Sequence, residues 1–143
     1  MKKVQITIAL LFITTVSFGQ WFIGNTFDQV KTDVSTTLEM SNLKTETDDD
    51  GFITLIAADE TCIMHYGFDA KKKCKISLIK PLNQYVKDII LKEIADHGKK
   101  LTSNKFDNLW LFNEAGTYLY IIYYEDKELG YFTAEIAKKE STL

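Results

Sequence analysis

The segment 61–98 has the sequence TCIMHYGFDAKKKCKISLIKPLNQYVKDIILKEIADHG, which holds the strongest secondary-structure pattern in the chain. Two apolar runs around a lysine-rich turn predict a β-hairpin, and a proline then leads into an amphipathic helix. The apolar residues of that helix recur at helical spacing: Leu82, Tyr85, Val86, Ile89, Ile90 and Ile94. Asn83 is placed to cap the start of the helix and Gly98 to end it. We therefore predict a helix over 82–97.

The first 19 residues have the pattern of a secretory signal peptide. Lys2 and Lys3 give a positive start, residues 4–16 form an apolar run, and Ser17-Phe18-Gly19 is a small-x-small cleavage site. An uncleaved anchor is the alternative, but the run is shorter than the roughly 20 residues of a spanning helix. No cysteine follows the cleavage site, so no lipid anchor is expected. We predict a bacterial protein, periplasmic or secreted, whose mature part 20–143 is a single domain.

The charge of the mature chain argues against a polyanionic partner. The full chain has 17 basic and 20 acidic residues; without Lys2 and Lys3 the basic count is 15, which gives a net charge of −5. Every basic residue is a lysine, whereas bidentate phosphate and base contacts are usually made by arginine. Nucleic acid and an anionic membrane surface are therefore not expected as partners.

Further elements follow from periodicity and turn signals. Thr26 and Gln29 match a capping box that starts a helix over 26–38. The segment 40–47 fits either a strand or a loop, and 98–105 is interpreted as a polar connection. We expect Trp21-Phe22-Ile23 to pack against the first helix or to add an edge strand. Six strands are predicted over 52–58, 61–68, 74–79, 106–113, 117–124 and 129–137.

The two halves of the mature chain align without a gap at a shift of 56 residues, which places Val30 on Val86 and Val34 on Ile90. The alignment suggests pseudo-repeats over about 26–80 and 82–137, each an αβββ unit. Two similar halves by coincidence are the alternative. The predicted fold is α+β: one antiparallel sheet of about six strands with two helices packed on one face.

The same alignment assigns the two faces of the sheet. It places Cys62, Met64, Tyr66 and Phe68 on the helix-covered side, together with Tyr118, Tyr120, Ile122 and Tyr124. The opposite face of the second half then carries Trp110, Phe112, Leu119, Ile121, Tyr123 and Tyr131. An aromatic face on the solvent side of a sheet is typical of a contact surface, unless residues 21–23 or the C-terminal tail fold over it.

Signals of catalytic chemistry are sparse. His65 lies mid-strand and His97 in the last helical turn, where both are expected to be structural. The chain has no G-x-S-x-G, H-E-x-x-H or C-x-x-C motif. In the predicted hairpin Cys74 lies opposite Tyr66 and Cys62 opposite Leu78, roughly 13 Å apart, so two free thiols are expected rather than a disulfide. No enzyme activity, metal or cofactor is predicted.

The order of elements resembles the small secreted α+β domains built from tandem units, such as the β-lactamase inhibitor protein and PepSY-like domains. The resemblance covers the whole mature chain as a pattern of elements, and it implies a non-catalytic module that binds a protein or peptide on its sheet. We expect an exported binding module whose aromatic face holds a protein partner or a second copy. The alternatives are a carrier of a small hydrophobic ligand, with a pocket between that face and the Trp21 segment, and a hydrolase or metal site around His65.

Overall fold

The computed structural model describes residues 21–114 and 116–137. The predicted signal peptide and the predicted C-terminal tail lie outside the described residues. Within them the chain forms two helices and eight strands: α2 (Phe27–Thr36), β1 (Asn42–Thr47), β2 (Ile53–Ala58), β3 (Cys62–Phe68), β4 (Cys74–Pro81), α3 (Gln84–His97), β5 (Gly98–Leu101), β6 (Leu109–Glu114), β7 (Thr117–Tyr124) and β8 (Tyr131–Ile136).

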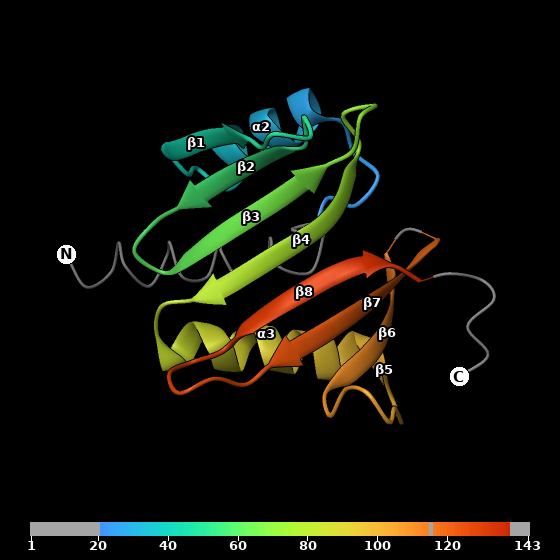
Figure 1. The fold of residues 1–143 in the computed structure, drawn as a ribbon. Coiled ribbons are helices and arrows are strands. Elements are labelled where there is room, and N and C mark those ends of the chain that lie inside the picture. The colour runs from blue at the N-terminus through green and yellow to red at the C-terminus, as the bar shows by residue number, and fades with distance from the viewer. Residues whose placement is uncertain (1–20, 115, 138–143) are drawn as a thin grey trace.

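All eight strands belong to one antiparallel sheet with the order β1-β2-β3-β4-β8-β7-β6-β5. Each half is a four-strand meander, and the two meanders join where β4 pairs with β8. Both helices lie behind this sheet in Figure 1, α2 behind the first meander and α3 behind the second. The α+β class with an antiparallel sheet is therefore confirmed, whereas the predicted strand number is wrong.

The two additional strands are the sheet edges. β1 lies in the segment 40–47, for which the sequence fitted either a strand or a loop. β5 lies in the segment 98–105, which was predicted to be a polar connection. Both are short of apolar residues: β1 carries Lys44 and Glu46, and β5 has the sequence GKKL. Charged side chains on an edge strand disfavour pairing with another chain. They also interrupt the alternation of apolar residues by which a strand is predicted from sequence.

Capping residues set the start of both helices, as predicted. The Thr26 hydroxyl accepts a hydrogen bond from the Gln29 amide at 3.2 Å, and the Gln29 side chain accepts one from the Thr26 amide at 2.9 Å. The Asn83 side chain accepts a hydrogen bond from the Val86 amide at 2.9 Å. Gly98 follows α3 in an extended conformation and begins β5 directly.

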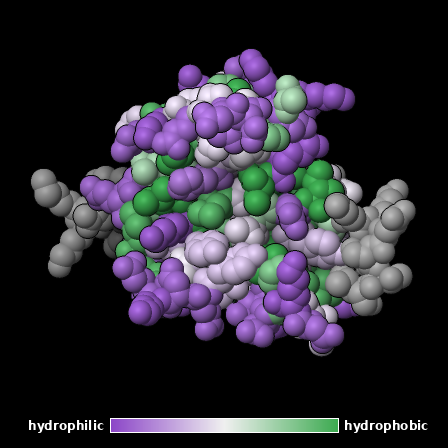
Figure 2. Space-filling view, in the orientation of Figure 1, coloured by the Kyte–Doolittle hydropathy of each residue, from purple (hydrophilic) through white to green (hydrophobic). Residues whose placement is uncertain are grey.

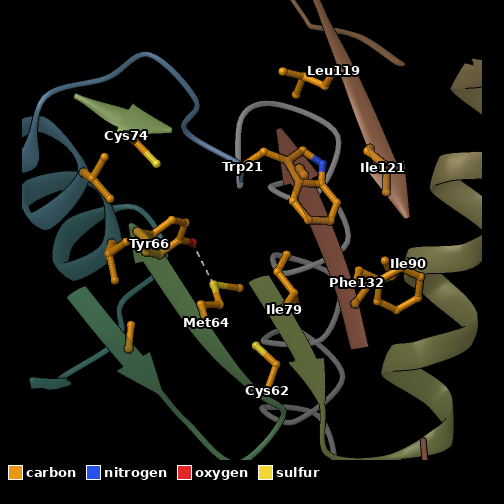
Figure 3. Close-up of a cluster of buried hydrophobic side chains, with 14 of the residues drawn as sticks. Trp21, Cys62, Met64, Tyr66, Cys74, Ile79, Ile90, Leu119, Ile121 and Phe132 are labelled. Carbon is orange, nitrogen blue, oxygen red and sulfur yellow. Dashed lines mark hydrogen bonds between the residues drawn. The ribbon is translucent and has the colours of Figure 1, made fainter. Parts of the chain in front are cut away.

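The core lies between the sheet and the helices. It includes Trp21, Val34, Met64, Tyr66, Ile79, Ile90, Ile121 and Phe132. Figure 3 shows Trp21 among side chains of the central strands, with the Tyr66 hydroxyl bonded to the Met64 sulfur. The Ser77 hydroxyl donates to the carbonyl oxygen of Trp21, so this residue is fixed on the helix side of β4. Residues 21–23 therefore pack on the helix side of the sheet, with Trp21 as part of the core.

Candidate functional site

The predicted contact surface on the second meander is the buried side of the sheet. Leu119 and Ile121 are 0% exposed, and Trp110 and Tyr123 are each 7% exposed. Phe112 is half-buried and packs against the same core. Of the six predicted residues, only Tyr131 lies on the side away from the helices, where it pairs with Tyr124. The face assignment for the second half is therefore wrong, and these five residues are core residues.

A change of one residue in the spacing of the halves explains the error. At a shift of 56 the buried residues of the two helices coincide, Val34 with Ile90 for example. The buried residues of β7, however, are Leu119, Ile121 and Tyr123, which follow Cys62, Met64 and Tyr66 of β3 by 57 positions. Neighbouring residues of a strand point to opposite faces, so a slip of one position moves the whole apolar set to the other side.

The side of the sheet away from the helices, here the open face, carries many apolar and aromatic residues. The ladder pairings place there Ile56, Ile63, His65, Ile76, Leu78, Leu109, Leu111, Tyr118, Tyr120, Ile122, Tyr124, Tyr131 and Thr133. Figure 2 looks onto this face and shows hydrophobic and near-neutral side chains across its middle, interspersed with some hydrophilic ones and surrounded by more of them. Ile76 is 46% exposed and Tyr118 is 52% exposed. A solvent-facing sheet surface is ordinarily polar, so this composition is unusual.

Nothing in residues 21–23 covers the open face. Trp21 lies in the core with Leu119 and Ile121, on the other side of the sheet. The Phe22 ring packs against Tyr66, which also points to the helix side, at a centroid distance of 5.6 Å. Residues 21–23 therefore lie over the side of the sheet that carries Leu119 and Ile121, as the alternative in the sequence analysis expected, and not over the open face. The predicted ligand pocket between Trp21 and the aromatic face is likewise occupied by packed core residues.

His65 lies near the middle of the open face. It pairs with Ile56 on β2 and with Leu78 on β4, so its strand neighbours are aliphatic. Partial burial lowers the pKa of His65, and the attraction of Glu46 opposes that shift only in part. The imidazole is therefore neutral at pH 7. Among the described residues no three of the types His, Cys, Asp and Glu converge as a metal site.

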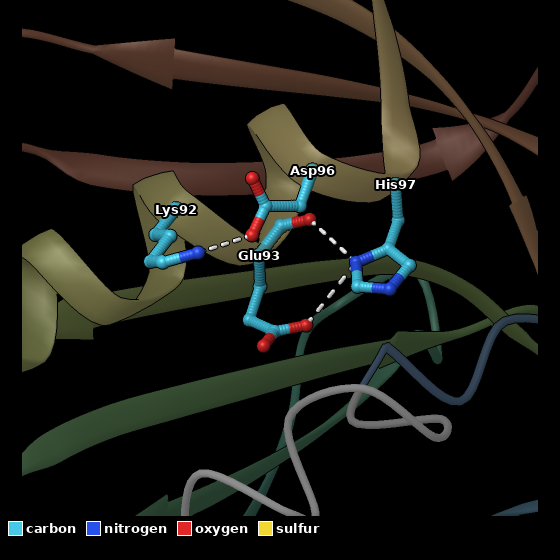
Figure 4. A network of polar contacts seen from close by, with 4 residues as sticks. All are labelled: Lys92, Glu93, Asp96 and His97. Carbon is cyan, nitrogen blue, oxygen red and sulfur yellow. Dashed lines mark hydrogen bonds and ion pairs between the residues drawn. The ribbon is translucent and has the colours of Figure 1, made fainter.

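His97 lies in the last turn of α3 and makes local contacts (Figure 4). Its Nδ1 is 3.3 Å from the Glu93 Oε2 and 3.1 Å from the Glu93 carbonyl oxygen. Lys92 pairs with Asp96 on the same helix. Pairs four residues apart on one helix stabilise the helix surface, and this geometry positions no group for chemistry.

Both cysteines are buried free thiols at opposite ends of the β3·β4 ladder. Cys62 pairs with Pro81 and Cys74 with Phe68, so the predicted register was wrong by three positions at Cys62 and by two at Cys74. An irregularity at Gly67 and Phe68 adds a residue to β4 there. Burial raises the pKa of Cys62 to about 12 and that of Cys74 to about 11. Both thiols therefore stay protonated and are poor nucleophiles at neutral pH.

A depression of about 440 Å³ lies beside β5, lined by Lys100, Leu101, Thr102, Ser103, Phe106 and Asp107. Four of these six residues are polar or charged. A carrier of hydrophobic ligands needs a predominantly apolar lining. The depression therefore does not support the carrier hypothesis.

An aromatic strip occupies one end of the open face. The rings of Tyr124 and Tyr131 stack at a centroid distance of 4.9 Å and an angle of 18°. Phe106, from the connection before β6, meets Tyr124 edge to face at 6.1 Å. All three side chains are half-buried. Sequence reasoning missed Phe106 and Tyr124 as surface residues, although the tyrosine hydroxyls are a signal of a side that reaches water.

No protein-family model matches the chain, and no curated protein or solved structure matches it. Among the described residues, neither helix has the length and apolar character needed to cross a bilayer.

Proposed function

We propose that this chain is an exported, non-catalytic binding module whose open face docks a protein partner. The observation that carries the proposal is the contrast between the face and its edges. On the central strands the face is mostly apolar and tyrosine-rich, with Lys80 and Glu135 among its residues, whereas the edge strands carry Lys44, Glu46, Lys99 and Lys100. Charged edges disfavour strand addition, so recognition through the face is the mode that this sheet supports. Export rests on the signal-peptide pattern of residues 1–19.

The open face has the size of a protein interface. Eight strands about 4.8 Å apart span about 34 Å, and six residues along a strand span about 20 Å. The projected area is therefore about 700 Å², close to the roughly 800 Å² that each partner buries in a standard interface. A small ligand would leave most of this surface in water.

The residue types on the face also favour a protein partner. Tyr118, Tyr120, Tyr124 and Tyr131 all lie on it. Tyrosine is enriched at interface hot spots because its ring buries a large area while its hydroxyl still hydrogen-bonds. The neutral His65 adds no charge that a partner would have to desolvate.

The proposal extends to the origin of the fold. Each half has the same order, one helix followed by four strands, and β4 meets β8 at the centre of the sheet. This arrangement supports a tandem duplication of an αββββ unit, with a one-residue difference between the copies. It also supports the resemblance to secreted tandem α+β domains such as the β-lactamase inhibitor protein and PepSY-like domains.

The docking surface is tested by affinity capture of a tagged chain from cells that make the protein. One variant combines Ile76→Glu and Tyr118→Glu, two exposed apolar residues of the open face. The matched control combines Leu82→Glu and Tyr85→Glu, two exposed apolar residues at the start of α3. We expect the wild type and the control to capture a partner in near-stoichiometric amount, and the open-face variant to lose at least about tenfold of it.

Equal capture by the two variants would contradict the proposal, as would the absence of a partner for the wild type. A second, differently tagged copy of the chain in the same cells separates self-association from a distinct partner. If this copy is the captured protein, the partner is the chain itself.

A further inference from the structure

The aromatic strip differs from the rest of the open face in its shape and in its surrounding charge. It is formed by Phe106, Tyr124 and Tyr131 and continues across β4 and β3 with Lys80 and Ile63. The strip crosses the neighbouring strands β3, β4, β8 and β7 and ends at Phe106 in the connection before β6, so it runs across the strands and not along one of them.

The rings of the strip are packed against one another. Tyr124 and Tyr131 stack on each other at 18°, so their inner faces are already occupied. A carbohydrate ligand would stack its sugar ring on an exposed aromatic face, and the stacking of Tyr124 on Tyr131 leaves few such faces exposed. Neither tyrosine hydroxyl has a hydrogen bond among the described residues, which leaves two donors beside an apolar surface.

The turns at this end of the sheet are acidic. The β7–β8 turn carries Glu125, Asp126 and Glu128, and the β2–β3 turn carries Asp59 and Glu60. Nearby positive charges are Lys80, Lys87, Lys105 and Lys127, four against these five carboxylates. Carboxylates therefore outnumber ammonium groups at this end, and a basic ligand is favoured.

The β7–β8 turn is held in a fixed shape. The Asp126 carboxylate accepts hydrogen bonds from the amides of Glu128 at 2.7 Å and Gly130 at 2.9 Å. These bonds lower the pKa of Asp126, with a smaller contribution from the positive charges of Lys80 and Lys87. The acidic turn is thus charged and ordered beside the two tyrosines that it connects.

We propose that the aromatic strip recognises an extended, proline-containing basic segment of the partner. A polyproline II helix has no internal hydrogen bonds, so its carbonyl groups are free to accept from tyrosine hydroxyls. The proline rings of such a helix would pack against the aromatic side chains of the strip. Proline-rich segments dock on aromatic-lined grooves in this way. From β3 to β7 the strip spans about 14 Å, and Phe106 extends it to about 20 Å, the length of about six residues of such a helix.

This inference deepens the proposed function and rests on it. The test is a fluorescence-anisotropy titration of the purified protein with a labelled peptide of eight prolines flanked by two lysines on each side. One control peptide replaces the prolines by glycine and serine, and a second replaces the lysines by glutamates. We expect saturable binding of the first peptide and at least about tenfold weaker binding of both controls.

Variants of the protein locate the binding to the strip. Tyr131→Ala is expected to weaken binding of the proline-lysine peptide by about tenfold, and Tyr131→Phe by a smaller factor because only the hydroxyl is lost. Tyr118→Ala is the matched control, since Tyr118 lies on the same face but on the neighbouring strand β7, at the end away from the aromatic strip. It should change the affinity by less than about twofold, a near-neutral interface substitution. Circular dichroism checks that each variant is folded.

Absence of saturable binding, or equal binding by the wild type and Tyr131→Ala, would overturn the inference. Equal binding of the glycine-serine peptide would overturn the role of proline, and equal binding of the glutamate peptide the role of charge. The capture experiment changes Ile76 and Tyr118 and leaves the strip intact. If the wild type captures a partner and the open-face variant loses it, while the proline-lysine peptide does not bind, the inference about the strip is contradicted and the proposed function is not.

Discussion

Replacing Ile121 by alanine is expected to lower the free energy of unfolding by about 2–5 kcal/mol, because it leaves a cavity in a fully packed core. Ile121 is 0% exposed and lies on the helix side of β7. Urea denaturation followed by tryptophan fluorescence measures the loss. The matched substitution Tyr118→Ala, on the same strand but on the open face, is expected to cost less than about 1 kcal/mol.

This pair of substitutions tests the orientation of β7. The sequence alignment placed Ile121 on the exposed side and Tyr118 on the helix side, so it predicts the opposite ranking. A larger cost for Tyr118→Ala than for Ile121→Ala would contradict the arrangement of the second meander.

Replacing Gly130 by alanine is expected to destabilise the protein by about 2–5 kcal/mol, through backbone strain and a steric clash together. Gly130 has φ of +69°, a region that residues with a side chain rarely adopt. An added Cβ would lie against the carbonyl oxygen of Tyr124 and 2.7 Å from the Tyr123 ring. Thermal unfolding by calorimetry measures the effect.

The control for this substitution is Gly116→Ala. Gly116 has a similar φ of +86°, but an added Cβ would meet nothing within 4 Å. We expect a cost of only about 1–2 kcal/mol from the backbone alone. An equal loss of stability at the two positions would show that the close packing of the β7–β8 turn on Tyr123 and Tyr124 does not contribute to the free energy of unfolding.

The elements that local chemistry specifies were predictable from the sequence. Thr26 with Gln29 and Asn83 set the two helix starts, and the structure has both caps. Cys62, Met64 and Tyr66 were assigned to the helix side of β3, and the structure buries these three residues. In these segments only one periodicity fits the residue types.

The faces of β7 were not predictable from alternation because both sets of positions are apolar. The strand reads TYLYIIYY, with Leu119 and Ile121 on one side and Tyr118 and Tyr120 on the other. A sheet with an apolar open face removes the polar signal that ordinarily marks the solvent side. The remaining difference is one of degree: the open side carries Tyr118, Tyr120 and Tyr124 with Ile122, whereas the buried side carries Leu119 and Ile121 with Tyr123.

The kind of candidate surface was therefore predicted, but its residues were assigned to the wrong side of the sheet. The sequence indicates an apolar, aromatic sheet face, and the open face is of that kind. Its contribution from the first meander, with Ile63, Ile76 and Leu78, was missed because the prediction considered only the second half. Pairing of β4 with β8, which joins the two halves of the face, depends on long-range contacts that no local pattern encodes.

The most direct test of the docking surface is site-specific photo-crosslinking in cells that make the protein. A photoreactive phenylalanine analogue is placed at Tyr118 on the open face or at Tyr85 on α3, which are similarly exposed at 52% and 59%. If the open face docks a protein partner, irradiation will join the chain to one protein of defined mass from position 118 and not from position 85. Crosslinks from position 85 alone, or an unmodified chain at both positions, would contradict the proposal.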